Sequence, residues 1–232
     1  MSVETFFDKL EAKIVPYDLL KHPFYQAWSA GELTRTDLRE YASEYWHIVS
    51  AFPTLLSALH SNLPDSDLRR TVLRNLSDEE GIGARDGRPH SDLWMDFAKG
   101  MGADSPEVVE RSINPETHAL IETFRKLMHQ QPAKALAALY AYESRVPEIA
   151  RTKAEGLAAH YSADDVTRRY FTLHEKADIF HAKVWRNALA EQTCGNAATE
   201  ATACDAAETV ARALWCSLDG VERQRQARLQ LA

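Results

Sequence analysis

The chain has 232 residues, which is long for one average domain and short for two. Apolar residues make up 45% and charged residues 26%, as in soluble globular proteins, and this balance excludes a disordered, collagen-like or transmembrane chain. The net charge of −7 disfavours nucleic acid and anionic membrane surfaces as partners.

The scarcity of glycine and proline predicts long helices. Each occurs nine times, together about 8% of the chain, against about 12% in average proteins. Apolar spacing and capping signals predict helices in this order: 3–15, 22–33, 34–63, 65–80, one from residue 90, one from residue 115, 133–160, 163–192 and 195–232. No run alternates in the manner of a strand. We therefore expect an all-α bundle in one domain, residues 1–192, followed by a C-terminal helical extension, residues 193–232.

Several local signals mark the helix boundaries. Gly31 is placed to end the second helix, and Thr34 with Asp37 three residues later is a variant of the capping box. Pro53 lies inside the third predicted helix, where a proline removes one backbone hydrogen bond and usually kinks the rod. The sequence GIGARDGRP at residues 81–89 is the one long loop that we expect within the bundle.

The ends of the chain bear on its location. The first residues, MSVETFFDKLEAKIV, are acidic and amphipathic and lack the basic region of a signal peptide. The three cysteines, Cys194, Cys204 and Cys216, are odd in number, gathered near the C-terminus and unsuited in spacing to a zinc site. We therefore expect a protein of the reducing cytoplasm, with no membrane association.

The most informative segment is HEKADIFH, residues 174–181. Its spacings of four and three residues place His174, Asp178 and His181 on one face of a helix. Two imidazoles with a carboxylate between them suit a first-row transition metal, whereas calcium and magnesium prefer oxygen ligands. The alternative interpretation is a solvated polar face.

A second candidate ligand is Glu143, which lies in an otherwise alanine- and leucine-rich helix. Burying a carboxylate is costly unless it is paired or bound to a metal. Pro147, four residues later, cannot donate an amide hydrogen to the carbonyl of Glu143. We therefore expect the helix to distort beside this residue.

Glu79 and His90 flank the glycine-rich loop and complete a set of three carboxylates and three histidines. Such a set fits a carboxylate-bridged two-metal site inside a helical bundle, with iron or a manganese–iron pair as the metals. These six residues do not follow the Glu-x-x-His pattern of ferritin-like bundles. Glu80 is an alternative to Glu79, since adjacent residues on a helix face about 100° apart.

Four stretches resemble the heme-oxygenase-like dimetal oxidases and oxygenases: HPFYQAWSAGELT (22–34), AFPTLLSALHS (51–61), ALYAYESRVPEIARTKAEGL (138–157) and FTLHEKADIFHAK (171–183). Within that family the chain is most similar to the branch of the chlamydial protein associating with death domains. The resemblance implies a seven-helix bundle of the kind found in TenA and pyrroloquinoline-quinone synthases, with an O2-activating two-metal centre. The six ligands of the family match Glu79, His90, Glu143, His174, Asp178 and His181.

The resemblance also implies a reaction. Members of this branch are proposed to make p-aminobenzoate for folate biosynthesis from one of their own tyrosines, with O2, an external reductant and two metals, Fe/Fe or Mn/Fe. The protein would then be a self-sacrificing reactant. Tyr25 matches the tyrosine thought to supply the ring, and Lys153 matches the lysine proposed as amino donor.

Other aromatic residues are placed to assist this chemistry or to pack in the core. Tyr41 and Tyr45 lie four residues apart and, with Trp46, could relay an oxidising equivalent. Tyr142 and Lys153 lie eleven residues apart, about 1100° of helix, and so share a face. Four other histidines, His60, His118, His129 and His160, have no partners at ligand spacing, and we interpret them as structural or exposed.

Two other kinds of function remain open at this point. One is a metal-free enzyme like the pyrroloquinoline-quinone synthases or the thiamin-degrading relatives, which use a cysteine in the bundle. The other is a non-enzymatic protein-binding module whose histidines and carboxylates form an ion-pair network. We also expect a homodimer, by analogy with related bundles.

Overall fold

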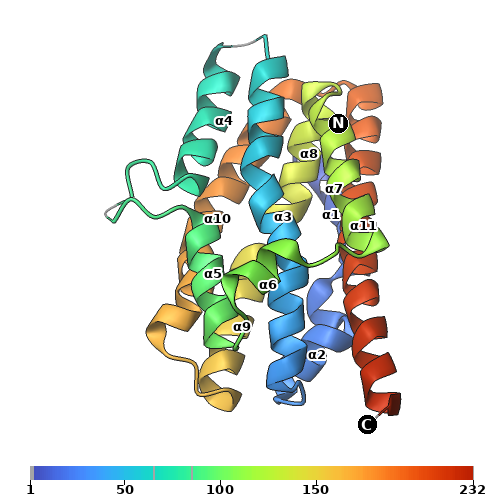
Figure 1. Ribbon diagram of the computed structural model, residues 1–232. Helices are drawn as coiled ribbons and strands as arrows, with labels where there is room; N and C mark the ends of the chain where they lie inside the picture. Colours follow the sequence, from blue (N-terminus) through green and yellow to red (C-terminus); the bar gives the residue numbers. More distant parts are fainter. Residues whose placement is uncertain (1–2, 65, 85, 232) are drawn as a thin grey trace.

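The computed structural model describes residues 3–64, 66–84 and 86–231, which form helices and connecting turns without a strand. The helices in chain order are α1 (Val3–Ile14), the 3₁₀ turns η1 (Val15–Tyr17) and η2 (Leu19–Lys21), α2 (Pro23–Ala30), α3 (Arg35–Asn62), α4 (Ser66–Glu79), α5 (His90–Gly100), α6 (Ser105–Glu110), α7 (Pro115–Met128), α8 (Pro132–Glu143), α9 (Val146–His160), α10 (Asp165–Thr193) and α11 (Ala197–Leu231). Figure 1 shows the long helices running side by side, with α11 along one edge. None of these described helices is long and apolar enough to cross a membrane.

Two predicted boundaries are present with their capping contacts. The amide of Asp37 donates to Thr34 Oγ1 at 3.1 Å, and the amide of Thr34 donates to Asp37 Oδ2 at 2.8 Å, so a reciprocal cap begins α3. α2 ends at Gly31, whose φ of +72° suits glycine; a Cβ there would lie 2.6 Å from the ring of His160. Pro53 lies inside α3, which is continuous.

The single helix predicted over 133–160 is wrong, because the structure has two helices there. α8 ends at Glu143, and α9 begins at Val146, one residue before Pro147. The interruption expected beside Glu143 is therefore present, and it follows from the amide hydrogen that Pro147 lacks.

The number of helices also differs from the seven that the resemblance implies. The described residues form eleven α-helices, because residues 133–160 are divided and short helices such as α2 and α6 are counted with the long ones. α6 follows the N-cap Asp104, whose side chain accepts from the amide of Glu107. This short helix was not predicted, since six residues are too few to show a helical period.

The C-terminal helix shares the core with the rest of the bundle. α11 packs along α7 and α8, and its residues Val210 and Leu214 belong to one buried apolar cluster while Leu218 and Val221 belong to a second. The further helix expected at the C-terminus is thus present. The division of the chain at residue 192 remains a prediction about domain organisation.

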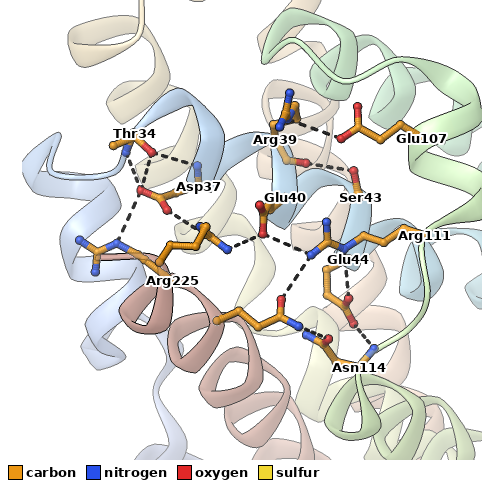
Figure 2. A network of polar contacts seen from close by, with 12 residues as sticks. Thr34, Asp37, Arg39, Glu40, Ser43, Glu44, Glu107, Arg111, Asn114 and Arg225 are labelled. Atoms are coloured by element: carbon orange, nitrogen blue, oxygen red, sulfur yellow. Dashed lines mark hydrogen bonds and ion pairs between the residues drawn. The ribbon is translucent and has the colours of Figure 1, made fainter. Parts of the chain in front are cut away.

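A polar network joins the end of α11 to the start of α3 (Figure 2). Arg225 approaches Asp37, and Arg228 Nη2 donates to Asp37 Oδ1 at 2.8 Å. Nearby, the amide of Asn114 donates to the buried Glu44 Oε1 at 3.0 Å. These contacts hold α11 and the turn before α7 against α3, the helix that carries Tyr41.

Candidate metal centre

Within residues 174–181, α10 turns polar side chains toward the protein interior and two large apolar side chains toward solvent. His174, Asp178 and His181 are at most 5% exposed, whereas Ile179 and Phe180 on the same helix are 63% and 62% exposed. The hydrophobic effect alone would give the opposite orientation. The shared face predicted for the three polar residues is therefore present, and it points inward.

The first of two buried triads consists of Glu79, His90 and His174, each of which offers one ligand atom within 4.8 Å of the other two. Glu79 ends α4 and His90 begins α5, so the triad joins three helices. His174 Nδ1 lies 2.8 Å from the carbonyl oxygen of Tyr170, which can only accept, and Nε2 of this ring therefore keeps its lone pair. Glu80 is exposed, so Glu79 is the carboxylate that joins the triad.

The second triad consists of Glu143, Asp178 and His181, again within 4.8 Å. His181 Nδ1 lies 3.1 Å from Asp178 Oδ1 and 4.0 Å from Glu143 Oε2. The indole N–H of Trp185, one turn further along α10, donates to Glu143 Oε2. The two triads together contain the six residues that the sequence analysis selected, and their role as metal ligands remains a prediction.

The protonation of these groups reflects their crowding. Burial raises the pKa of the Glu143 carboxyl well above its ordinary value, and the neighbouring Asp178 carboxyl raises it further. Burial opposes the charged form of Glu79 as well, but the imidazoles of His90 and His174 outweigh it and lower the pKa. Burial likewise opposes the charged form of His181, yet Asp178 and Glu143 raise its pKa to about 9. The carboxyl groups and imidazoles of the two triads therefore compete for protons inside the protein. A bound cation would interact favourably with several of these carboxylates and imidazoles at once.

Each triad also contains a buried polar atom that lacks a hydrogen-bond partner within the described residues. These atoms are Glu143 Oε1 and His90 Nδ1, the latter lying 2.9 Å from Glu79 Oε2 but outside hydrogen-bond geometry. Buried polar atoms without partners are rare in proteins and call for an ion or water. Mixed imidazole and carboxylate donors suit iron and manganese, so the residues fit the two metals that the resemblance implies.

A second polar cluster surrounds Lys153, which is only 5% exposed. Its Nζ donates to the hydroxyl oxygens of Tyr25 and Tyr41, each at 2.7 Å, and these two hydroxyls lie 3.0 Å apart. Nζ also lies 4.2 Å from the centre of the Tyr25 ring. Burial lowers the pKa of Lys153 well below its ordinary value and raises that of Tyr25. Both shifts favour the neutral form, of the amine and of the phenol alike.

Two adjoining cavities connect the triads with this cluster. One is lined by Glu79, Glu143, His174 and Asp178, and the other by Tyr25, Lys153 and His174. His174 and Tyr142 line both cavities. The second cavity, about 30 Å3, has room for about two water molecules, so little water reaches the lysine.

The remaining aromatic predictions are met in part. Tyr142 donates to or accepts from the hydroxyl of Tyr45 at 2.8 Å and shares a cavity with Lys153, although α8 and α9 are separate helices. Tyr41 and Tyr45 stack with ring centres 5.5 Å apart. The tryptophan against Tyr45 is Trp94 on α5, at 4.9 Å, which spacing along α3 could not reveal.

The sequence analysis missed three residues that contact the triads. Tyr170 stacks on His174 with ring centres 4.1 Å apart, Trp185 donates to Glu143, and Asp78 lies 3.1 Å from His181 Nε2. Tyr170 and Trp185 lie one turn from His174 and His181 on α10, so helical spacing was the available signal. Asp78 is next to Glu79, but only the fold brings it to His181.

Residues 39–216 match the family of iron-containing redox enzymes, and the chain belongs to that family. It is 39% identical to the 4-aminobenzoate synthase of Nitrosomonas europaea, over 99% of this chain and 96% of that protein. It is 40% identical to the 4-aminobenzoate synthase of Chlamydia muridarum, over 77% of this chain and 75% of that protein. A solved domain of unknown function with a heme oxygenase-like fold, from Shewanella denitrificans, matches with a TM-score of 0.83 at 17% identity, covering 100% of this chain and 97% of that one. The heme oxygenase-like fold and the resemblance inferred from the sequence are thereby confirmed.

Proposed function

We propose that this protein forms 4-aminobenzoate for folate biosynthesis from its own Tyr25, with O2, an external reductant and two metals held by the six triad residues. The metals are Fe/Fe or Mn/Fe, and the protein is consumed in a single turnover in the cytoplasm. Two relatives that align with most of this chain carry the name 4-aminobenzoate synthase. The proposal is supported further by the residues around Lys153.

The contact between Lys153 and Tyr25 is the observation that carries the proposal. In 4-aminobenzoate the amino group occupies the ring position of the tyrosine hydroxyl, and the carboxyl carbon occupies that of the tyrosine Cβ. Nζ of Lys153 lies 2.7 Å from the Tyr25 hydroxyl oxygen. A nitrogen therefore already lies beside the ring position that must receive it.

The protonation states suit this role. An amine is nucleophilic only when it is neutral, and burial lowers the pKa of Lys153 well below its ordinary value. The phenolic proton of Tyr25 has two neighbours that can take it, Lys153 Nζ at 2.7 Å and Tyr41 Oη at 3.0 Å. The low water content of the cavity protects a reactive ring from hydrolysis.

Glu79, His90 and His174 would hold one metal, and Glu143, Asp178 and His181 the other. When bound, such a pair supplies O2 activation and the removal of electrons from a nearby ring. His174 lines the cavity that contains the triad carboxylates and also the cavity that contains Tyr25. The His174 side chain therefore lies between the proposed metal site and the tyrosine. Tyr170, stacked on His174 and accepting from its Nδ1–H, fixes the orientation of that ring.

Tyr25 is favoured over Tyr41 as the consumed residue because of its place at the cavity. Both hydroxyls lie 2.7 Å from Lys153. Tyr25 lines the cavity that His174 also lines, whereas Tyr41 packs behind it in the apolar core with no exposed surface.

Isotope tracing tests the proposal. Protein made with ring-13C tyrosine and ε-15N lysine is loaded with metal, reduced and exposed to O2, and released 4-aminobenzoate is examined by mass spectrometry. We expect 13C in the ring and 15N in the amino group, with no product from Tyr25→Phe and an intact Tyr41 in the spent protein. Unlabelled product would overturn the self-sacrificing route.

The alternatives predict different results. A thiamin-degrading enzyme would need a cysteine at the bundle cavity, yet Cys194 and Cys216 are exposed and Cys204 lies on α11 against α1. A metal-free enzyme related to pyrroloquinoline-quinone synthases would bind fewer than about one metal per chain. A protein-binding module would keep its partner in a His174→Ala variant that binds no metal.

A further inference from the structure

We propose that Asp78 is a positioning residue that orients His181 by accepting a hydrogen bond from its Nε2, so that Nδ1 faces Glu143 and Asp178. This inference rests on the proposed metal-binding role of the second triad. Asp78 itself belongs to neither triad.

The two edges of the His181 ring have different neighbours. Nε2 lies 3.1 Å from Asp78 Oδ2, and Nδ1 lies 3.1 Å from Asp178 Oδ1 on the triad side. A ligating imidazole is neutral and carries one N–H. If Asp78, which can only accept, holds that hydrogen on Nε2, the lone pair of Nδ1 is left for the metal. Histidines that bind metals commonly donate their other N–H to a carboxylate in this way.

Asp78 and Glu79 serve different triads from adjacent positions. Consecutive residues on a helix point about 100° apart. Glu79 turns toward His90 and is 6% exposed, whereas the Asp78 side chain is 53% exposed and reaches His181 across the contact between α4 and α10. The last turn of α4 therefore supplies a candidate ligand to the first triad and a support to the second.

The surroundings of Asp78 show why one hydrogen bond can decide the ring orientation. A cavity of about 120 Å3 between α4 and α10 is lined by Asp78, His181, Phe180 and Trp185. The His181 side chain borders this cavity, so packing on that side does not by itself fix the ring. Because Asp78 is half exposed, its hydrogen bond adds little to global stability. Its removal should therefore leave the protein folded.

Metal binding in a background that keeps only the second triad tests this role. Metal-free full-length His90→Ala protein is titrated with Mn2+ and, in parallel, loaded with Co2+, whose visible absorption reports its coordination. In this background we expect Asp78→Ala to weaken Mn2+ binding by about 10- to 100-fold and to change the Co2+ spectrum. The amide oxygen of Asp78→Asn can still accept a hydrogen bond from Nε2. We therefore expect this variant to keep most of the Mn2+ affinity and most of the original Co2+ spectrum.

Asp67→Ala is the matched control, because Asp67 lies on the same helix and its side chain is 89% exposed. It should behave as the parent, and all variants should keep the parental melting temperature. Unchanged Mn2+ affinity in Asp78→Ala, or an equal loss in Asp78→Asn, would overturn the positioning role while leaving the metal centre in place. A wild-type protein that binds no metal would overturn both proposals.

Discussion

Nδ1 of His90 lies 2.9 Å from Oε2 of Glu79, although the two residues belong to different helices. Glu79 ends α4 and His90 begins α5, so the loop between them must turn back tightly. Gly81 permits this turn: its φ is +70°, and a Cβ there would lie 2.4 Å from the carbonyl carbon of Arg88. The first triad therefore depends on a glycine that offers it no ligand atom.

Gly81→Ala should disturb the first triad without disturbing the second. The new Cβ would collide with the backbone of Arg88, and the left-handed conformation costs a non-glycine residue about 1–2 kcal/mol. We expect a loss of unfolding free energy beyond that range and a weaker affinity for one of two metals, measured by denaturant unfolding and metal titration. Gly83→Ala is the control, because φ is +87° there but no atom lies within 4 Å of the Cβ. Equal metal affinities in Gly81→Ala and Gly83→Ala would show that the turn at Gly81 does not determine the geometry of the first triad.

Replacing Lys153 with methionine should stabilise the protein while abolishing product. The buried lysine has a pKa well below the value of 10.5 that it has when exposed. Below pH 10.5 the unfolded chain therefore holds this proton more tightly than the folded chain does, and this difference favours unfolding. We expect Lys153→Met to unfold at higher temperature at pH 7, with an advantage that shrinks as the pH rises toward 10.5.

The exposed Lys126 provides the control, since Lys126→Met removes the same charge from α7. Its effect on the melting temperature should be small and independent of pH between 7 and about 10. A Lys153→Met variant that is less stable than wild type at every pH would contradict a buried lysine whose lowered pKa opposes folding.

The contact between α11 and α3 should make stability sensitive to acid. Burial alone would raise the pKa of Asp37, but hydrogen bonds from Arg228 and Thr34 lower it below 3.8. The resulting stabilisation is complete above that pH and is lost as the pH falls through the folded-state pKa. Arg228→Ala should cost about 1–2 kcal/mol at pH 7, and the difference from wild type should shrink below pH 4.

A more exposed ion pair on the same helix serves for comparison. Arg223 pairs with Glu116 at 2.8 Å with a side chain that is 60% exposed, so Arg223→Ala should cost about 0–1 kcal/mol. Chemical denaturation over a series of pH values measures both variants. If Arg228→Ala and Arg223→Ala lose the same unfolding free energy at every pH, the contact with Asp37 stabilises the protein no more than an exposed ion pair does.

Removal of residues 193–232 tests the domain boundary. The deletion would take away α11, whose Ala203, Ala207 and Val210 are fully buried in the core. We expect the shortened chain to lose its cooperative unfolding transition, which calorimetry and circular dichroism would show. A stable, cooperatively folded 1–192 would establish the extension as a separate addition to the bundle.

Local patterns identified most of the helices and candidate ligands. The capping pair Thr34 and Asp37 and the proline at 147 act through their own backbone neighbours, so their effects can be read from the chain. The spacing of His174, Asp178 and His181 defined one face in the same way. Spacing also suggested a single helix over 133–160, whereas the structure ends one helix at Glu143 and begins the next at Val146.

The sequence by itself determined the helical class of the protein and the residues capable of binding metal, because helical periodicity and side-chain chemistry are local properties. Only the tertiary structure decided how those residues are grouped: Glu79 with His90 and His174, Glu143 with Asp178 and His181, and Lys153 with Tyr25. These groupings join residues up to 128 positions apart along the chain. They depend on the packing of whole helices, and no short-range pattern contains that information.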